Sequence, residues 1–201
     1  FAVGLAQVEL PRMVAEPLHL LDCCLVTDGG GAVVVASAER AAGARKEPIW
    51  ILGQGESHTH NTIANMPDLA THGAAVASGR AAFERAGLTP ADIDVAEIYD
   101  SFTITVIMTL EALGFCAPGE GGAFVSGQRT APGGPFPMNT NGGGLSYCHP
   151  GMYGIFLLIE ATRQLRGECG PRQVEGARIA LAHGTGGVLS SAATVLLGKD
   201  G

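Results

Sequence analysis

The sequence is poor in aromatic and charged side chains, which make up 5% and 15% of its 201 residues. It has no basic cluster and a net charge of −7, so a nucleic-acid-binding surface is not indicated. No apolar run approaches the roughly 20 residues that cross a bilayer, and the N-terminus has no charged start followed by an apolar signal core. The abundance of Gly, 30 residues, instead favours close packing of helices on a sheet.

The five cysteines form an odd set without a CxxC pair, so neither a disulfide framework nor a zinc ribbon is indicated. A reducing, cytoplasmic setting is expected. His58 and His60 have the spacing of metal ligands, but the sequence offers no third ligand nearby, and no metal site is predicted. The chain starts at Phe1 without an initiator Met and reads like the middle of a protein, so we expect a fragment or a processed chain.

The first half of the chain alternates apolar runs with polar segments. The apolar run 24–37 predicts a buried strand pair or a strand entered by a tight turn. The polar stretch 39–48 is a candidate interdomain connection, followed by a strand at 49–52 and an irregular segment at 53–70. The Ala-rich run 71–86, stopped by a glycine, predicts a helix.

The second half reads as strands alternating with helices, which predicts a sheet with helices on its faces. We expect a strand at 95–100, then strand, turn and helix at 101–114. The segment 117–144 is rich in Gly and Pro and is expected to be a long loop. A helix at 152–166 and two strands joined by a Gly-rich turn at 177–198 complete the chain.

Three polar clusters fall at the ends of expected elements, at 97–101, 139–154 and 183–187. In the middle one, His149 precedes Pro150 and a helix, a position that favours a neutral imidazole and binds developing negative charge. A neutral His donates a hydrogen bond to an enolate or thioester oxygen. The alternative is a histidine that only caps the helix.

These motifs together resemble the thiolase superfamily, in particular thiolases of the sterol-carrier-protein type. The strings "NTNGGGLSYCHPGMYG" and "EATRQLRGECGPRQVEGARIALAHGTGGV" follow that pattern, "LTPADIDVAEIYDSFT" aligns with its strand ending in His-Asp-Cys-Phe, and "DGGGAVVVAS" is similar to the end of its N-terminal domain. The resemblance implies an α/β fold, half of an αβαβα sandwich with a mixed sheet. Residues 1–45 would be the tail of the N-terminal domain and 46–201 the C-terminal domain.

The resemblance also implies roles for individual residues. His149 matches the oxyanion-site histidine of the His-Pro-Gly motif. Asn141 and Gly143 fall on the Asn and Gly-Gly of the pattern and would bind substrate. His183 opens the closing Gly-rich turn as a further catalytic candidate, and the backbone amide of Gly186 would hold the thioester oxygen. The nucleophilic Cys of the family would lie upstream of Phe1.

One departure from the family is informative. Where those thiolases have His-Asp-Cys-Phe, this chain has Tyr99, Asp100 and Ser101 before Phe102, and a serine hydroxyl cannot replace a thiol with a pKa near 8.5. The pattern is similar to thiolase-like retro-aldolases, which use tyrosines here and work with an OB-fold partner. Tyr99 and Tyr147 resemble those tyrosines; alternatively, each is a half-buried aromatic held by one hydrogen bond.

Three functions therefore stay open. The leading one is a thiolase-like acyl-CoA enzyme, an acyltransferase that makes or breaks carbon–carbon bonds with coenzyme A as co-substrate and no other cofactor. The second is a retro-aldolase, a lyase that cleaves a β-hydroxyacyl-CoA with a partner subunit. The third is a non-catalytic thiolase-fold subunit for assembly or lipid-CoA binding. In each case the resemblance implies an apolar face for the missing half and a homodimer.

Overall fold

The computed structural model describes residues 12–200. The predicted tail of an N-terminal domain, residues 1–45, falls in part on residues 1–11, which lie outside the described residues. The strands are β1 Met13–Ala15, β2 Leu18–His19, β3 Trp50–His58, β4 Val95–Ile98, β5 Ile179–Gly186 and β6 Ser191–Gly198. The α-helices are α2 Ala38–Ala41, α3 Gly73–Ala86, α4 Thr103–Ala112, α5 Gly121–Val125, α6 Gly143–Ser146 and α7 Gly154–Leu165, and the short 3-10 turns are η1 Leu20–Asp22, η2 Ile63–Asn65, η3 Pro90–Asp92 and η4 Gly170–Arg172.

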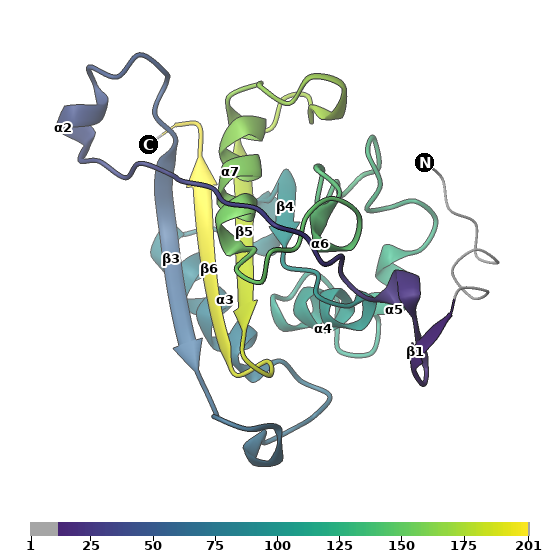
Figure 1. Ribbon diagram of the computed structural model, residues 1–201. Helices are drawn as coiled ribbons and strands as arrows, with labels where there is room; N and C mark the ends of the chain where they lie inside the picture. Colours follow the sequence, from purple (N-terminus) through teal and green to yellow (C-terminus); the bar gives the residue numbers. More distant parts are fainter. Residues whose placement is uncertain (1–11, 201) are drawn as a thin grey trace.

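The main sheet has four strands in the order β3-β6-β5-β4 (Figure 1). Its first two pairings, β3 with β6 and β6 with β5, are antiparallel, whereas β5 and β4 run parallel. The predicted mixed sheet is therefore confirmed. Because parallel neighbours need a crossover, the chain between β4 and β5 passes over the sheet, and it carries α4 to α7.

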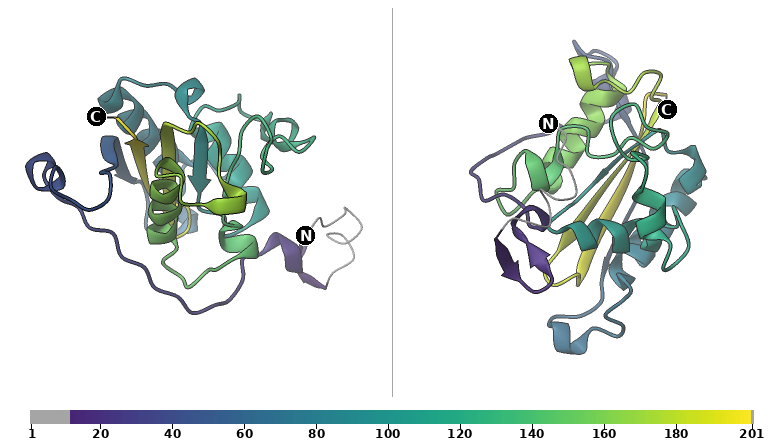
Figure 2. Two further views of the ribbon diagram at one scale, coloured as in Figure 1. Left: turned by 90° about the horizontal axis from the view of Figure 1, so that it is seen from above. Right: turned by 90° about the vertical axis from the view of Figure 1, so that its right-hand side faces the viewer.

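The helices cover the two faces of the sheet separately (Figure 2). On one face α3 and α4 pack over a core that includes Phe83, Leu110 and Leu181. On the other face α7 packs over β4 and β5, with Leu157 and Leu165 at the centre of a second core. The expected helices at 71–86 and 152–166 correspond to α3 and α7, with their ends displaced by up to two residues.

Strand β3 extends through residues that the sequence predicted to be irregular. Gly53 and Gly55 lie directly against the backbone of α3, where a Cβ on either residue would collide with the carbonyl oxygens of Ala82 and Ser78. The glycines that lower strand propensity thus allow a close helix-on-sheet contact. The prediction for 53–58 was wrong because composition alone does not reveal such a contact.

The segment 24–37 is extended but forms no strand pair, so this prediction was also wrong. It crosses over α7 between η1 and α2 (Figure 1), with Gly31 against the Ile159 side chain. Val26 and Val34 are 100% and 95% exposed. The apolar pattern encodes extended backbone, but among residues 12–200 no strand lies beside it to complete a ladder.

Two further expectations changed in detail. The strand expected before the helix of 101–114 is absent. Phe102 is extended but α4 begins at the next residue, Thr103, which leaves no room for a strand. The segment 117–144 is mainly loop, as predicted, and contains the short α5. Within the described part of the chain, no helix is both long and apolar enough to cross a membrane.

Candidate active site

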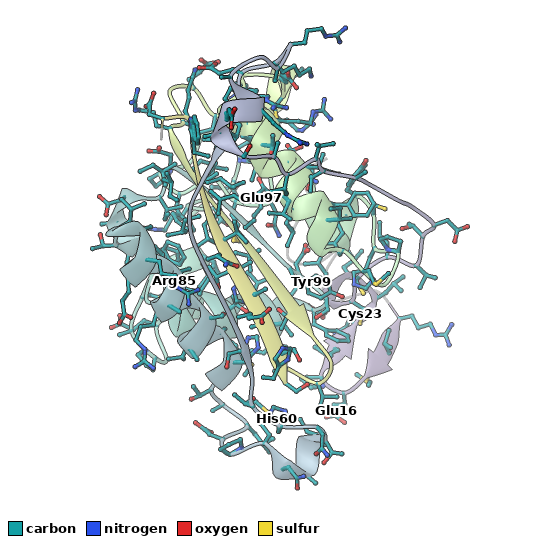
Figure 3. All side chains as sticks on the ribbon, turned by 90° about the vertical axis from the view of Figure 1, so that its left-hand side faces the viewer. Glu16, Cys23, His60, Arg85, Glu97 and Tyr99 are labelled. Atoms are coloured by element: carbon teal, nitrogen blue, oxygen red, sulfur yellow. The ribbon has the colours of Figure 1, made fainter. Side chains whose placement is uncertain are left out.

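The centre of the site is a hydrogen bond between a tyrosine and a histidine that lie far apart in the sequence. Tyr99 follows the last residue of β4, and its Oη lies 2.6 Å from Nε2 of His149. The two rings meet edge to face with centroids 5.3 Å apart. The Tyr99 backbone N–H donates to the carbonyl of His183 on β5, which fixes the end of β4. Tyr99 is labelled in Figure 3.

Burial is the first cause of a raised Tyr99 pKa, and the nearby Cys24 and Asp100 add to it. A raised pKa keeps the phenol protonated at neutral pH, so it can serve as a hydrogen-bond donor. The side chain remains half-buried. The site therefore holds a neutral, partly accessible phenol against an imidazole.

The backbone of His149 is held by the extended segment that crosses α7. Its N–H donates to Oγ1 of Thr27 at 2.8 Å, and the Thr27 hydroxyl donates to Sγ of Cys148 at 3.3 Å. Cys148 is buried against Asp28 and Gly29, while the ring of His149 turns to Tyr99. The side chains of the adjacent Cys148 and His149 thus point apart within a loop.

A buried carboxylate shapes the glycine turn beside the pair. Asp100 accepts hydrogen bonds from the backbone N–H of Gly144 at 2.6 Å and of Leu145 at 3.1 Å. Burial raises its pKa, and these N–H donors counter that rise. Gly143 has φ +65°, and a Cβ there would collide with the Asp100 carboxylate. The Gly-rich turn is thus required by the close approach of Asp100.

Two asparagines fix the turn that leads into this site. Asn139 accepts the Ile98 N–H at 2.7 Å and donates to the Ile98 carbonyl at 2.8 Å. Oδ1 of Asn141 accepts the Gly143 N–H at 2.9 Å and the Tyr153 hydroxyl at 3.2 Å. The side-chain oxygen of Asn141, predicted to bind substrate, is therefore already engaged within the protein.

Tyr153 is fully buried behind the pair. Its ring is 5.9 Å from that of Tyr99, and it stacks near His149 at 6.3 Å and Phe156 at 5.6 Å. Burial raises the pKa of its phenol. Tyr153 thus packs near the rings of Tyr99 and His149 and is held by one hydrogen bond to Asn141.

The structure separates the side chain of His183 from this group. Side chains alternate along β5, and His183 shares the α3 face with Leu181. Its Nδ1 lies 2.8 Å from Oγ1 of Thr194, and its ring is 6.1 Å from that of His72. Burial lowers the pKa of His183 to about 3 and that of His72 to about 4, so both are neutral.

Only the backbone of the closing turn lies near the start of α7. A Cβ on Gly184 would be 3.9 Å from Cα of Gly154, the first residue of α7. Gly186 ends β5 opposite Ser191, and Gly187 has φ +61° in the turn that follows. β5 thus approaches the start of α7 through the main chain of Gly184, not through the His183 ring.

Two other predicted site residues stand apart from the Tyr99–His149 pair. Oγ of Ser101 lies 3.3 Å from Oγ1 of Thr105 at the start of α4. Tyr147 is 54% exposed at the end of α6. Of the predicted tyrosines, the structure therefore brings only Tyr99 to His149.

Sequence reasoning missed two contributors. Thr27 lies in a segment read as a buried strand, and nothing in its pattern indicates a contact with His149. Glu97 is a carboxyl group with all strand neighbours buried, which is a signal for a buried ionisable group. It contacts Thr140, between the two asparagines.

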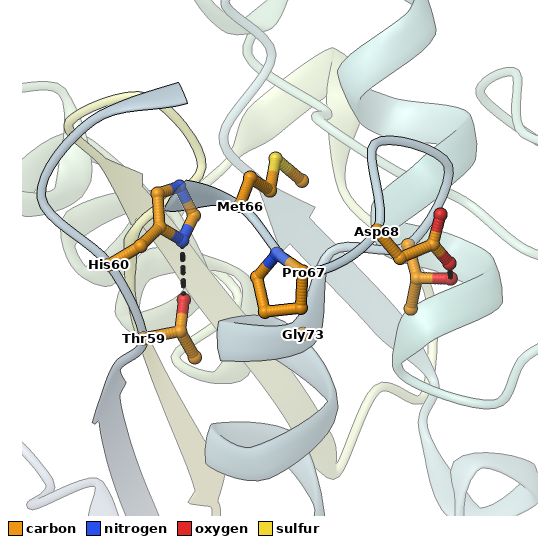
Figure 4. A pocket seen from close by; sticks show the side chains of 7 residues that line it. Thr59, His60, Met66, Pro67, Asp68 and Gly73 are labelled. Atoms are coloured by element: carbon orange, nitrogen blue, oxygen red, sulfur yellow. Dashed lines mark hydrogen bonds between the residues drawn. The ribbon is translucent and has the colours of Figure 1, made fainter. Parts of the chain in front are cut away.

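A separate hollow of about 210 Å³ opens at the start of α3 (Figure 4). It is lined in part by His60, whose Nε2 lies 3.0 Å from the Val188 carbonyl oxygen, and by Asp68, which accepts the Thr71 hydroxyl. His58 instead contacts Ser191 at 2.7 Å. Among residues 12–200, no group of three or more His, Cys, Asp or Glu could hold a metal ion. This hollow contains none of the predicted site residues.

The sequence matches the family described as thiolase C-terminal domain-like over residues 55–199. The chain belongs to this family. The thiolase-superfamily resemblance and the layered α/β fold predicted from the sequence are both confirmed.

Similar proteins include enzymes that act on CoA compounds and steroids. Acetyl-CoA acetyltransferase of Methanothermobacter thermautotrophicus is 38% identical over 98% of this chain and 52% of its own length. 17-hydroxy-3-oxo-4-pregnene-20-carboxyl-CoA lyase of Mycobacterium tuberculosis is 43% identical over 78% of this chain and 41% of its own. The solved structure "Ltp2-ChsH2(DUF35) aldolase" has a TM-score of 0.88 and 32% identity, covering 98% of this chain and 51% of that one.

The chain spans about half the length of the relatives that it matches. Their names are those of acyltransferases and of lyases or aldolases. They agree with the predicted class, thiolase-superfamily enzymes of acyl-CoA metabolism, and include the retro-aldolase variant.

Proposed function

We propose that this chain is the C-terminal half of a thiolase-fold lyase that cleaves the bond between the α- and β-carbons of a β-hydroxyacyl-CoA. The observation that carries the proposal is the 2.6 Å contact between Tyr99 Oη and His149 Nε2. A phenol bonded to an imidazole can relay a proton from a substrate hydroxyl. The relatives named as a lyase and an aldolase support the same chemistry.

The proton of the β-hydroxyl passes to Oη of Tyr99 as the phenol gives its own proton to Nε2 of His149. The hydroxyl oxygen becomes a carbonyl while the α–β bond breaks. The electron pair of that bond is left on the α-carbon and is delocalised onto the thioester oxygen as an enolate. His149, now an imidazolium, stabilises this charge and then protonates the α-carbon, which releases an aldehyde or ketone and a shortened acyl-CoA.

The surroundings of His149 suit this role. It lies ahead of the N-terminus of α7, where the helix dipole favours the negative charge of an enolate. The nearby backbone of the closing turn, including the N–H of Gly186, is a further candidate donor to the thioester oxygen. In this scheme Asn141 and Gly143 shape the turn around the substrate, Ser101 and Tyr147 lie at the margin, and His183 takes no part.

Acyl transfer by a thiolase mechanism is the second candidate. It is favoured by the acetyl-CoA acetyltransferase relative, 38% identical to this chain. It requires a nucleophilic Cys in the half of the protein that precedes this chain. Ser101 in place of the acid/base Cys disfavours it, because a hydroxyl is a far weaker acid than a thiol.

The proposed partners are the N-terminal thiolase half, a second copy of the protein and a further subunit. Residues 1–45 would belong to the N-terminal thiolase domain and 46–201 to the C-terminal one, with the exposed valines of segment 24–37 pairing against the missing half. Thiolase halves also pair as homodimers. The name "Ltp2-ChsH2(DUF35) aldolase" joins two components, which supports a partner subunit here, with an OB-fold as the proposed type.

The proposed setting is cytoplasmic, in keeping with five free cysteines. Coenzyme A enters as part of the substrate, and the proposed chemistry requires no further cofactor. Every step uses side chains and backbone groups of the protein itself.

The test uses the full-length protein, with and without its partner subunit, and mass spectrometry of the products. A β-hydroxyacyl-CoA should yield an aldehyde or ketone and a shortened acyl-CoA without an acyl adduct on the protein. An acyl-Cys adduct would instead support acyl transfer, and CoA binding without turnover would support the non-catalytic subunit. Tyr99→Phe should abolish cleavage, whereas the matched control Tyr147→Phe, at an exposed ring, should retain it.

A further inference from the structure

Behind the Tyr99–His149 pair, a fully enclosed hydroxyl meets three polar groups. Oγ1 of Thr140 lies 2.9 Å from Oε1 of Glu97, 2.8 Å from Oε1 of Glu160 and 2.8 Å from Nε2 of Gln164. All four side chains are buried. Glu97 lies on β4, beside α7 and two residues before Tyr99, which follows the strand (Figure 3).

Counting protons at this hydroxyl constrains the two carboxyl groups. A threonine hydroxyl has one hydrogen to donate and two lone pairs that accept. The Gln164 amide donates to one lone pair, and the hydroxyl hydrogen goes to one carboxylate. The second carboxyl group then faces the remaining lone pair, so it must bring a proton of its own.

The contacts of Glu160 identify it as the ionised member. Arg172 donates to both of its oxygens, from Nε at 2.7 Å and from Nη2 at 3.1 Å. Cys169 donates a third bond from Sγ at 3.6 Å. The Thr140 N–H makes one long contact to Oε1 of Glu97 at 3.4 Å, but Glu97 has no cation beside it, and its Oε2 has no hydrogen-bond partner among the described residues. An isolated, buried carboxylate is far costlier than a neutral acid.

We propose that Glu97 is a neutral carboxylic acid that donates its proton to Thr140 and thereby positions the active-site turn against the end of β4. The chain of donors runs from Glu97 through Thr140 to the carboxylate of Glu160. This inference deepens the proposed function and rests on it for the link to turnover. The protonation of Glu97 stands on the contacts alone.

The position of Thr140 explains how the hydrogen bond from Glu97 affects the site. Its neighbours Asn139 and Asn141 hold the Ile98 backbone, at the end of β4, and the Tyr153 hydroxyl. A donor bond from Glu97 therefore ties the strand that carries Tyr99 to the turn that leads to His149. Glu97 does not touch the substrate, so it is a positioning residue.

The charges around Glu97 act in the same direction. Burial raises its pKa to about 8, and the carboxylates of Glu160 on α7 and Asp100 at the end of β4 add to the rise. Cys169 and Tyr153, also nearby, have raised pKa values and stay neutral. The Arg172 guanidinium is engaged by Glu160.

Loss of the Glu97 proton sets the direction in which activity depends on pH. Below pH 8 the native state holds the Glu97 proton and the turn is fixed. Above pH 8 the proton leaves, the carboxylate of Glu97 faces that of Glu160, and Glu97 no longer donates to the Thr140 hydroxyl. Activity should therefore fall on the alkaline side with a midpoint near 8.

Infrared difference spectroscopy of the full-length protein tests the proton directly. Wild type minus Glu97→Gln at pH 7 should contain the carbonyl band of a protonated carboxylic acid. The matched control, wild type minus Glu168→Gln at an ion-paired surface residue, should lack it. In wild type the band should disappear on titration through pH 8 and shift in Thr140→Val. If wild type has no such band at pH 7, the proposal is overturned.

Kinetics test the positioning role. Glu97→Gln, which keeps a donor but cannot ionise, should retain at least tenfold more kcat than Glu97→Leu, the gap expected for about 1.4 kcal/mol of lost hydrogen bonding. It should also lose the alkaline fall near pH 8. An unchanged alkaline fall in Glu97→Gln contradicts the role. The infrared arm needs no substrate, so failure of the proposed cleavage leaves its result intact.

Discussion

Buried polar side chains are more completely hydrogen-bonded on the α7 face of the sheet than on the α3 face. On the α7 face, Thr140, Glu160 and Gln164 form a continuous chain of hydrogen bonds and an ion pair with Arg172. On the α3 face, His72 is fully buried with neither ring nitrogen bonded among the described residues, and Nε2 of His183 also lacks a partner there.

Under the proposed function, the α7 face holds groups that position the reacting side chains, whereas the histidines of the α3 face only pack. Connected groups on the α7 face have their protons and orientations fixed by neighbours, which is what a reactive site needs. The histidines on the α3 face are held neutral by burial. A buried histidine is therefore not by itself a sign of catalysis in this fold.

The largest expected effect comes from replacing His149, with the same replacement of His183 on the α3 face as the control. His149→Asn should lower kcat by about 10²- to 10³-fold, the usual cost of losing a group that stabilises an oxyanion. His183→Asn should leave kcat within a few fold and mainly change the free energy of unfolding. Steady-state kinetics and urea unfolding of both full-length variants measure this. A loss of kcat in His183→Asn alone would reverse the assignment of the faces.

Gly143→Ala should destabilise the protein by about 2 to 4 kcal/mol, because it adds a collision with Asp100 to the strain of a positive φ. Gly176→Ala is the matched control: its φ is +76° and no atom lies within 4 Å of the added Cβ. It should cost about 1 kcal/mol. Equal losses in chemical denaturation would show that the Asp100 contact adds nothing.

Acid should lower the free energy of unfolding through the two buried histidines of the α3 face. The pKa values of His72 and His183 are lowered from 6.5 to about 4 and about 3. The unfolded chain therefore binds more protons below pH 6.5, and stability falls as pH drops from 6.5 towards 4. The slope should reach about 1.4 kcal/mol per pH unit for each histidine. Unfolding free energies of wild type and His72→Phe across this range measure it, and an equal slope in both contradicts the assignment to His72.

The smallest effect is expected at Thr27. Thr27→Val keeps the shape but removes the acceptor for the His149 N–H, at a cost of about 1 kcal/mol of stability. It should lower kcat a few fold as the His149 ring loses its fixed position. Thr27→Ser should restore both values. A Ser variant no better than Val would show that the hydroxyl does not hold this loop.

Much of the fold could be predicted because its signals are local. The Ala-rich run of α3 and the paired apolar strands β5 and β6 carry their own periodicity. The failures depend on distant partners. Segment 24–37 has the composition of a strand, but a strand also needs a neighbour, and Gly53 and Gly55 disrupt a strand pattern that only contact with α3 explains.

The site was predictable in part for the same reason. His149 stands out by its motif, and Tyr99 by its place at a strand end. The hydrogen bonds of Thr27 and Thr140 cross long stretches of sequence and leave no local pattern. His183 stands in a motif as clear as that of His149, but its face depends on the alternation of a strand within the folded sheet.

The parallel pairing of β4 with β5 has a consequence for diversification. The ladder from Val95 to Ile98 closes on Ala180 to His183 whatever the chain does in between. The segment 113–138 lies in that excursion, outside the helices α4 and α7. Met138 bridges to Ala96 and Phe136 lies in a buried core, so these residues are fixed, but insertions or deletions in the exposed stretch 117–120 leave the register of the sheet untouched. Descendants of this scaffold can thus change the length of this loop without altering the strand pairing.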